Sequence, residues 1–274
     1  MIKIIVTGAS GFLGQYVLAR LKQHDVEVVG VSRGHAPGLF HVPSYADAPS
    51  GDVLIHLGEA NDRGWVNSQG AEYEREVSKN LKALLDKGFG QVVYSSSSVL
   101  YGDQNISLSK VSDEIKVSDV YTSVKYKSEQ AVLEQGGIAV RLANLYGRGM
   151  SQQNVLSAAL NQLSADAPMS LHNLKPIRDF LWVGDAADAL VKMALSKSSG
   201  IFNLGTGVGV SIHELAELIL VSAKQKSRTI VSKLPADDTE SVSHLVVDIS
   251  ETTKEFEWQP QVALSDGLET LVNS

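Results

Sequence analysis

The sequence of 274 residues predicts an α/β protein built around a doubly wound parallel sheet. Three observations support this prediction. Short apolar runs typical of buried strands recur along the first part of the chain, stretches with helical apolar spacing separate them, and a glycine-rich turn follows the first run. Alternating strands and helices are typical of parallel sheets, because each helix returns the chain to the start of the next strand.

The individual elements follow from the sequence in order. Residues 2–7 form a continuous apolar run that ends at a glycine, which is typical of a strand buried on both faces. Residues 12–24 carry apolar side chains at helical spacing, and residues 26–31 return to a buried-strand pattern. The alternation continues, and we expect strands at 53–57, 91–97 and 138–142 and helices at 71–85 and 120–134.

The pattern changes after residue 149. Helical spacing recurs near 154–163, 183–195 and 211–224, with short strand-like pieces such as 201–204. We expect this part to form a smaller α/β cap that is interleaved with the sheet, since no low-complexity linker separates the two. The predicted domains are therefore 1–149, to which part of 178–204 returns, and 150–274, which is mainly cap.

Composition argues against several classes of function. A net charge of -7 and a pI near 5.5 argue against nucleic acid as a partner, because nucleic acid requires basic patches. Cysteine is absent and the seven histidines lack the spacing of metal ligands, so we expect no disulfide and no metal site. No apolar run approaches the ~20 residues that span a bilayer, and no basic stretch precedes the first strand. A soluble cytoplasmic protein without a membrane partner is expected.

Three glycines follow the first strand at intervals of three. Gly8, Gly11 and Gly14 stand between a predicted strand and a predicted helix, where glycine allows a tight turn and the close approach of a pyrophosphate to the backbone. The helix N-terminus then stabilises the phosphates. An ordinary β-to-α turn is the alternative. We expect a dinucleotide cofactor to bind here, at Gly8, Ser10, Gly11, Phe12, Leu13 and Gly14.

The second strand ends in residues that favour a phosphorylated cofactor. A site selective for NAD carries Asp or Glu at this point to hold the ribose 2′-hydroxyl, whereas this chain has Ser32 and Arg33. Arginine pairs with a 2′-phosphate, so NADP is predicted and NAD is the alternative. The alternative is that Arg33 stacks on adenine or faces the solvent.

A tyrosine and a lysine lie one helical turn apart in the predicted helix 120–134. Tyr121 and Lys125 project from the same face, and the lysine ammonium favours the phenolate form of a tyrosine that otherwise titrates near pH ~10. Such a phenol exchanges a proton with a substrate hydroxyl or carbonyl near neutral pH. The alternative is a solvated pair, since Tyr126 and Lys127 lie next to it.

Together these motifs resemble those of the extended short-chain dehydrogenases/reductases, in particular the NAD(P)-dependent nucleotide-sugar epimerases, dehydratases and reductases. The resemblance covers nearly the whole chain and also includes residues 53–57, 95–102, 141–147, 178–183, 202–207 and 248–260. It implies a Rossmann-type sheet, a C-terminal substrate-binding cap and enzymatic activity. It also implies a homodimer, since many members of the family form dimers.

The resemblance also implies the catalytic residues. Aligned on Tyr101-Gly102, the serine strand places the family's catalytic serine at Ser97, although a register slip of one residue would select Ser96 instead. Tyr121 is the implied acid and base. Lys125 is implied to hold the nicotinamide ribose, and we expect Leu57 and Gly58 to lie beside the cofactor.

Two residues are implied to bind the substrate. Asn144 resembles the asparagine that contacts the nucleotide sugar, and Arg178 resembles the arginine that binds its diphosphate. The structural alternatives are a strand-end cap for Asn144 and an ion pair with Asp179 for Arg178.

The chain departs from the family pattern at four places. The crossover between the second strand and residue 53 is short, as in many 4-keto-6-deoxy nucleotide-sugar reductases. Gly58-Glu59 replaces the usual pair of alanines, which puts a carboxylate near the nicotinamide. Ser98-Val99 replaces the Asp-Glu pair of dehydratases, which argues against dehydration. The family's C-terminal Arg-Pro-Gly-Asp motif is absent, and Asp237-Asp238-Thr239 occupies its neighbourhood, so one arginine that binds the diphosphate is missing.

We therefore predict an NADP-dependent oxidoreductase acting on a nucleotide-linked sugar, reducing a 4-keto-6-deoxy sugar with Ser97, Tyr121 and Lys125. A nucleotide-sugar C4 epimerase is the first alternative, because it uses the same three residues. A cofactor-binding regulator without turnover is the second, since a fold alone does not prove catalysis.

Overall fold

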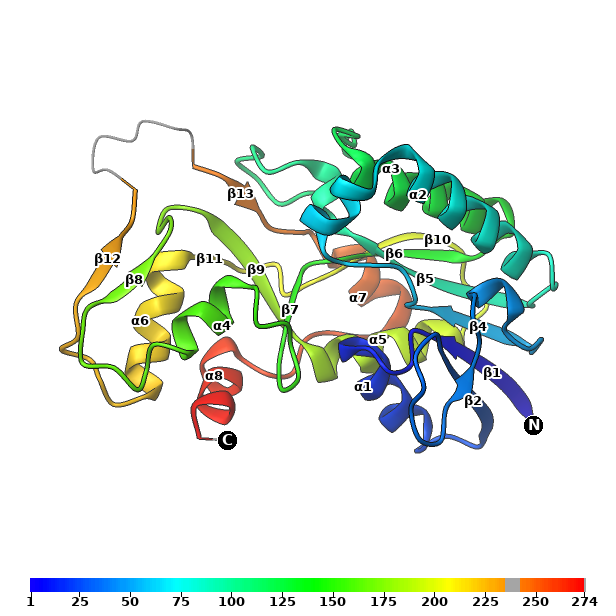
Figure 1. Cartoon of the computed structure of the whole chain (residues 1–274), viewed down its shortest axis with the longest axis horizontal. Helices are drawn as coiled ribbons and strands as arrows, with labels where there is room; N and C mark the ends of the chain where they lie inside the picture. Colours follow the sequence, from blue (N-terminus) through cyan, green and yellow to red (C-terminus); the bar gives the residue numbers. More distant parts are fainter. Residues whose placement is uncertain (235–241, 274) are drawn as a thin grey trace.

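The computed structural model describes residues 1–234 and 242–273, and a seven-stranded sheet forms its centre. All pairings in this sheet are parallel, and the strands lie in the order β10-β6-β5-β4-β1-β2-β3 (Figure 1). The strands are β1 (Ile2–Thr7), β2 (Val26–Ser32), β3 (Phe40–His41), β4 (Val53–His56), β5 (Gln91–Ser97), β6 (Ile138–Leu142) and β10 (Gly200–Leu204). The order reverses between β1 and β4, so the sheet is doubly wound and Rossmann-type, as predicted.

Helices cover both faces of this sheet. On one face α1 (Phe12–Leu21), α5 (Val183–Ala194) and α7 (Ser250–Phe256) pack together, and on the other α2 (Arg63–Leu85) packs against α3 (Val120–Glu134) (Figure 1). Parallel strands between two helical layers are buried on both sides, which explains their continuous apolar sequences.

The central strands are the most deeply buried part of the molecule. Ile4, Ile5 and Val6 of β1 and Leu54 and Ile55 of β4 are fully inaccessible to solvent. Burying each such side chain contributes roughly 1.5–3 kcal/mol, so β1 and β4 anchor the sheet. The residues that follow these two strands are therefore held on a rigid base.

Two features of the fold differ from the sequence-based expectation. The expected helix 71–85 is present as the second part of α2, and a further helical segment at 63–69, capped by the Asp62 carboxylate, precedes it; Gly70, with φ 68° and ψ -163°, is non-helical and separates the two parts. The short crossover also holds a strand, since β3 pairs with the end of β2. Glycine interrupts the helical periodicity, and two residues are too few to give a strand pattern.

A smaller lobe lies beyond the carboxyl ends of the central strands. Its core strand β9 (Ile177–Trp182) pairs with three short strands, which are β7 (Asn144–Tyr146), β11 (Gly209–Ser211) and β13 (His244–Leu245). The rest of the lobe consists of the parallel pair β8 (Met169–Leu171) and β12 (Ile230–Ser232) with α4 (Val155–Leu160), α6 (Ile212–Ser222) and α8 (Leu264–Val272). The chain leaves this lobe after β9 and returns after β10.

Within the described ranges, the model holds no helix that combines the length and apolar character needed to cross a bilayer.

Candidate active site

The glycine-rich turn brings the backbone of β1 and β4 into close contact. Gly8 has φ +71°, and a Cβ there would lie 2.5 Å from the carbonyl oxygen of Leu57. A Cβ on Gly14 would lie 2.2 Å from the carbonyl oxygen of Gly8. No side chain larger than hydrogen fits at either position without moving the backbone, so the turn is built for close approach.

The N-terminus of α1 fits the pyrophosphate of a dinucleotide. Gly11 is its N-cap and contributes no capping side chain, so the helix lacks an internal acceptor for the N–H groups of its first turn. These N–H groups belong to Phe12, Leu13 and Gly14. Uncapped N–H groups and the helix dipole favour an anion, and we infer that the predicted residues can hold the cofactor phosphates here.

Ser32 and Arg33 stand at the end of β2, close to the glycine-rich turn and where the adenosine ribose of a dinucleotide is expected. The hydroxyls of Ser10 and Ser32 share a hydrogen bond of 2.7 Å, and the Ser32 hydroxyl also accepts from Gly34 N at 3.2 Å. The Arg33 guanidinium lies 5.0 Å from the ring centroid of Tyr45. Tyr45 packs on Gly58, where a Cβ would lie 2.2 Å from its ring. Arg33 thus lies over an aromatic ring beside the expected ribose position, and it remains exposed.

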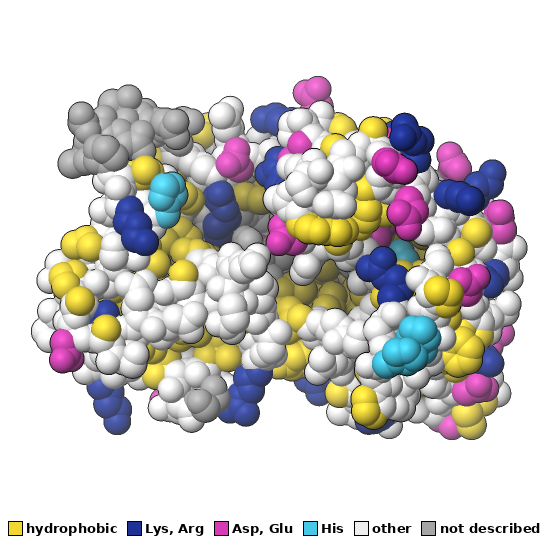
Figure 2. All heavy atoms as spheres, in the orientation of Figure 1, with side chains coloured by type: hydrophobic (Ala, Val, Ile, Leu, Met, Phe, Trp, Pro, Cys, Tyr) yellow, Lys and Arg dark blue, Asp and Glu magenta, His cyan; other side chains and the backbone are white. Residues whose placement is uncertain are grey.

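The two lobes leave a hollow over the carboxyl ends of the central strands (Figure 2). Ligands of doubly wound sheets bind at this edge, where the strand order reverses. The N-terminus of α3 and the serines at the end of β5 both lie at this edge.

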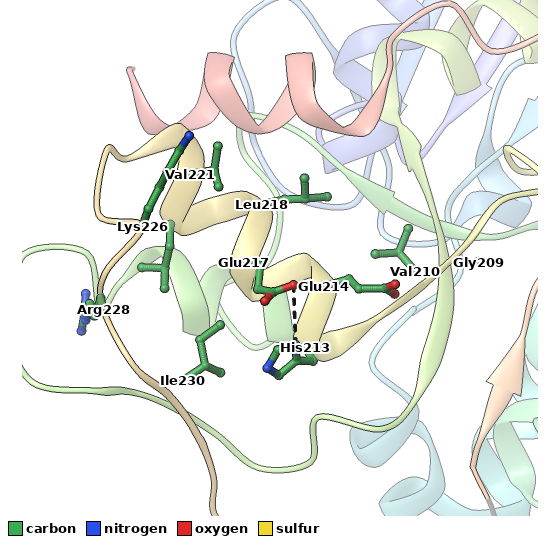
Figure 3. A pocket seen from close by; sticks show the side chains of 11 residues that line it. Gly209, Val210, His213, Glu214, Glu217, Leu218, Val221, Lys226, Arg228 and Ile230 are labelled. Carbon is green, nitrogen blue, oxygen red and sulfur yellow. Dashed lines mark ion pairs between the residues drawn. The ribbon is translucent and has the colours of Figure 1, made fainter.

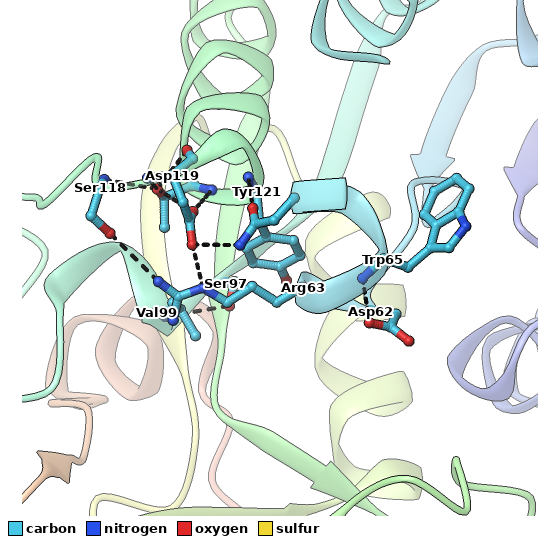
Figure 4. A network of polar contacts seen from close by, with 10 residues as sticks. Asp62, Arg63, Trp65, Ser97, Val99, Ser118, Asp119 and Tyr121 are labelled. Atoms are coloured by element: carbon cyan, nitrogen blue, oxygen red, sulfur yellow. Dashed lines mark hydrogen bonds and ion pairs between the residues drawn. The ribbon is translucent and has the colours of Figure 1, made fainter. Parts of the chain in front are cut away.

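Tyr121 sits in the first turn of α3, and a polar network fixes that turn (Figure 4). The Asp119 carboxylate accepts from Thr122 N at 2.9 Å, and the Thr122 hydroxyl accepts from Asp119 N at 3.0 Å, which forms a capping box. Asn67 of α2 accepts from Tyr121 N at 3.0 Å and donates to Asp119. The phenol oxygen of Tyr121 has no hydrogen-bond partner among the described residues, so it is free to meet a ligand.

Arg63 crosses this region toward Asp119 (Figure 4). Its Nε donates to the Asp119 carboxylate at 2.6 Å. Burial alone would raise the pKa of Asp119, but hydrogen bonds from Thr122, Asn67 and Arg63 lower it to about 2. Asp119 is therefore an anion at neutral pH, and it links the starts of α2 and α3.

The three serines that end β5 alternate in direction. Ser96 is buried and donates to Glu129 at 2.5 Å, so its hydroxyl already has a partner on α3. Ser97 is half-buried, and its hydroxyl accepts from Val99 N at 3.3 Å. Ser95 donates to the carbonyl of His56 at 3.2 Å. Of the two candidates for the catalytic serine, Ser97 is the one on the side of Tyr121 (Figure 4).

Lys125 is buried one turn after Tyr121 and is held by a carboxylate. Its Nζ donates to Glu59 at 3.1 Å and to the carbonyl of Ser95 at 3.0 Å. The Nζ also lies 5.9 Å from the ring centroid of Tyr121. Tyrosine and lysine are thus brought together as predicted from their spacing, but the lysine is not free.

A second buried ion pair lies farther along α3. Glu129 accepts two hydrogen bonds from the guanidinium of Arg141 on β6, at 3.0 and 2.9 Å. Burial alone would lower the pKa of Arg141, and the Glu129 carboxylate raises it above its ordinary value. The guanidinium also lies 4.8 Å from the ring centroid of Tyr101. This pair fixes α3 against β6 and contacts neither Tyr121 nor Lys125 directly.

The two predicted substrate residues lie at the β7–β9 junction. Asn144 is exposed and donates to the carbonyl of Asp179 at 3.2 Å. Arg178 does not pair with Asp179. Its guanidinium instead donates to the hydroxyl of Ser243 at 2.6 Å and lies 3.8 Å from the Asp103 carboxylate.

Asp179 has its own partners, since its carboxylate accepts from the backbone and hydroxyl of Thr206 and from Gly207 N. Asp237, Asp238 and Thr239, which occupy the neighbourhood of the family's missing diphosphate arginine, lie outside the described residues.

A cavity of about 700 Å³ opens over α6, in the smaller lobe (Figure 3). Its walls include an exposed pair of His213 and Glu217, with 3.7 Å between nitrogen and oxygen, and the basic side chains of Lys226 and Arg228. None of the predicted site residues lines it. The cavity is therefore separate from the candidate active site.

Two polar residues of the site, Arg63 and Asn67, were not predicted to belong to it. Glu59 was expected near the nicotinamide, but nothing in the sequence shows that it reaches Lys125. Arg63 and Asn67 lie in the part of α2 before the Gly70 kink, which carries no helical pattern. The aspartate three residues before Thr122 was a readable sign of a helix start.

The sequence of this chain is similar to those of known proteins. The family model described as "NAD dependent epimerase/dehydratase family" matches residues 4–205. The dTDP-4-dehydro-6-deoxyglucose reductase of Escherichia coli is 21% identical, over 99% of this chain and 96% of its own length.

Two solved structures share the fold. A UDP-glucose 4-epimerase of Thermotoga maritima with UDP-glucose has a TM-score of 0.87 at 20% identity, covering 99% of this chain and 98% of that one. RMD from Pseudomonas aeruginosa, complexed with NADPH, has a TM-score of 0.84 at 21% identity and covers 100% and 98%.

Proposed function

Because this chain belongs to the NAD dependent epimerase/dehydratase family, we propose that it is an NADP-dependent reductase of a 4-keto-6-deoxy nucleotide sugar. The family consists of NAD(P)-dependent enzymes that act on nucleotide sugars. In this proposal residues 1–149 hold the cofactor, and residues 150–274 supply most of the substrate site.

The observation that carries the proposal is the placement of Tyr121. Its phenol oxygen has no hydrogen-bond partner within the described chain, while its ring is buried and its backbone is fixed by Asn67. Lys125 lies one turn away in the same buried face. A fixed phenol beside an ammonium, at the edge where ligands of such sheets bind, is suited to protonate a carbonyl oxygen.

A reduced nicotinamide cofactor bound at this site would supply the hydride for the reduction of C4 of the sugar. Tyr121 donates its proton to the oxygen of the former carbonyl, so that a hydroxyl forms. The Ser97 hydroxyl steadies the same oxygen. Lys125 donates to the ribose and stabilises the phenolate that Tyr121 leaves behind.

Cofactor preference is the finer part of this proposal. Arg33 is exposed beside the expected ribose position, and no carboxylate stands next to it in the sequence to repel a 2′-phosphate. The similar RMD structure holds NADPH, which agrees with the choice. The homodimer and the cytoplasmic location expected from the sequence stay predictions.

A C4 epimerase is the second candidate, supported by the 0.87 TM-score to a UDP-glucose 4-epimerase. That reaction uses the same tyrosine, lysine and serine, with a cofactor that is oxidised and reduced in turn. The regulator without turnover ranks third. It would keep its function after replacement of Tyr121, whereas an enzyme would lose turnover.

The test is an incubation with stoichiometric NADPH and a 4-keto-6-deoxy nucleotide sugar, following reduced nicotinamide and product together. Disappearance of NADPH in step with a new 4-hydroxy sugar supports the reductase. Untouched NADPH, together with inversion of a 4-hydroxy nucleotide sugar, makes the protein an epimerase. The absence of both changes would contradict either enzymatic assignment for these substrates.

A further inference from the structure

Glu59 is a buried carboxylate at the edge of the sheet where the cofactor is expected. It follows β4, and its side chain is only 4% exposed. Three donors fix it. Lys125 donates at 3.1 Å, Ser128 donates at 2.6 Å, and the hydroxyl of Tyr94 donates as well. The carboxylate is therefore saturated by two residues of α3 and one of β5, and it cannot turn toward solvent.

Lys125 is oriented by the same contacts. Its ammonium has three N–H groups, and two of them donate to Glu59 and to the carbonyl of Ser95. Within the described chain this leaves one N–H for a ligand. The two acceptors thus determine where the remaining donor can point.

Burial and the carboxylate act on Lys125 in opposite directions. Burial pushes the pKa of Lys125 down, because a desolvated ammonium loses its proton more easily. The Glu59 carboxylate, followed by Tyr121, pushes it up, and the result lies above the ordinary value. Burial also acts to raise the pKa of Glu59, but Lys125, His56 and the hydrogen bonds from Ser128 and Tyr94 together lower it below its ordinary value.

The other titratable groups around this pair are Arg33, His56, Tyr73 and Tyr94. Burial lowers the pKa of His56 to about 4. Burial first, and the Glu59 charge as a further cause, raises the pKa of both Tyr73 and Tyr94. All three are neutral at pH 7, so Glu59 is the anion that balances Lys125.

We propose that Glu59 is the positioning residue of this site, which keeps Lys125 charged and directs its remaining N–H to the cofactor ribose. The inference rests on the proposed function only for the role of the ribose. The coupling between Glu59 and Lys125 stands on the geometry alone. A small residue at this position would leave the buried ammonium without a counter-ion.

The chain offers a matched control in Glu129 and Arg141. This pair is equally buried, with side chains 0% and 3% exposed, and Glu129 also lies on α3. The difference is chemical. A lysine can release its proton, whereas a guanidinium stays charged at every accessible pH. Removal of the two carboxylates should therefore have different consequences as pH rises.

The first experiment measures thermal unfolding of wild type, Glu59→Gln and Glu129→Gln from about pH 7 to about pH 9.5, a window above the pKa of His56 and below the ordinary tyrosine pKa of ~10. Both variants should lose Tm at pH 7, because each leaves a buried cation unpaired. In Glu59→Gln the folded-state pKa of Lys125 falls below its unfolded value, so the unfolded chain binds more protons and stability rises with pH. Its Tm deficit should shrink toward pH 9.5, and that of Glu129→Gln should stay constant.

A double variant keeps the test valid where Glu59→Gln is too unstable to measure. Replacing both charges, as Glu59→Gln with Lys125→Met, removes the unpaired ammonium and should raise Tm above that of Glu59→Gln alone. A Tm no higher than in the single variant, or a Glu59→Gln deficit that does not change with pH, would overturn the proposed coupling.

The second experiment follows NADPH-dependent reduction against pH. Above the lowered pKa of Lys125, Glu59→Gln should lose about tenfold in kcat for each pH unit, since only the ammonium is active. Glu59→Asp should restore most of the alkaline activity, and Glu129→Gln should keep the wild-type profile. An unchanged profile in Glu59→Gln would reduce Glu59 to a structural role. If wild type shows no reduction, the proposed function fails while the Tm measurements still decide the coupling.

Discussion

The sheet lobe and the smaller lobe hold their charged site residues in different ways. In the sheet lobe, Tyr121 and Lys125 lie one turn apart on a single helix. The buried Glu59, which holds the lysine, follows strand β4. In the smaller lobe, Arg178 is held by Ser243 and Asp103, which come from distant parts of the chain, and it stays 23% exposed. The residues predicted to carry out the reaction are therefore held rigidly. Arg178, which is predicted to bind the diphosphate, is held by contacts that a ligand can replace.

This difference indicates a division of labour. The groups of a buried network keep one protonation state and one arrangement, because no water molecule can replace a lost hydrogen-bond partner. An exposed arginine can exchange its internal partners for phosphate oxygens, which bind it in the same bidentate manner. We therefore expect substitutions in the sheet lobe to act on kcat and substitutions at Arg178 to act on KM.

Tyr121→Phe should have the largest effect. It removes the proton donor while the ring stays packed, so kcat should fall about 10²- to 10⁴-fold. Cofactor affinity, measured by NADPH fluorescence titration, should change little. Tyr126→Phe, on the same helix, is the control and should keep wild-type kcat. Equal kcat in the two variants would remove Tyr121 from the chemistry.

Ser97→Ala and Ser96→Ala separate the two serine candidates. Ser97→Ala should lower kcat about 10²-fold, as expected for loss of one donor to a developing oxyanion. Ser96→Ala removes a hydrogen bond to the buried Glu129, so it should lower Tm and leave kcat near wild type. If steady-state kinetics instead show a loss of kcat in Ser96→Ala and none in Ser97→Ala, Ser96 is the catalytic serine.

Arg178→Ala should raise KM for the nucleotide sugar about tenfold or more, the effect expected when hydrogen bonds from a charged group are lost. The value of kcat should change little, since the reacting atoms lie in the other lobe. Arg228→Ala is the control, because Arg228 donates to the carbonyls of Ala167 and Gln162 in the smaller lobe and lines the separate cavity over α6. If both variants raise KM equally, Arg178 has no special role.

Arg33→Ala should have the smallest effect. The ratio of NADPH to NADH affinity should fall about tenfold, because the loss is confined to the 2′-phosphate. Fluorescence titration with each cofactor measures it directly. Arg20→Ala, which removes an exposed ion pair with Asp188, should leave the ratio unchanged. An unchanged ratio in Arg33→Ala would mean that this guanidinium serves only its contact with Tyr45.

The parts of the fold that the sequence predicted correctly depend on local patterns. Strand β1 and helix α3 have the expected bounds, since apolar runs and helical spacing are read from neighbouring residues. The helical segment at 63–69 was missed because its sequence lacks helical apolar spacing, and the non-helical Gly70 separates it from the expected helix 71–85.

The same distinction between local and distant information applies to the candidate site. Tyr121, Lys125 and the three glycines were predicted from their spacing in the sequence. The partner of Arg178 was not, because Asp103 and Ser243 are 140 residues apart and meet only in the fold. The role of Glu59 was equally hidden, since a carboxylate after a strand gives no sign of which distant side chain it binds.

The most direct test of the central claim follows a deuterium atom. Wild type is incubated with a 4-keto-6-deoxy nucleotide sugar and NADPH deuterated at its transferable position, and the product is examined by mass spectrometry and NMR. We predict one deuterium at C4 of a new 4-hydroxy sugar, and Tyr121→Phe should form about 10²- to 10⁴-fold less of this labelled product in the same time. Product without deuterium at C4 would contradict reduction by NADPH at this site.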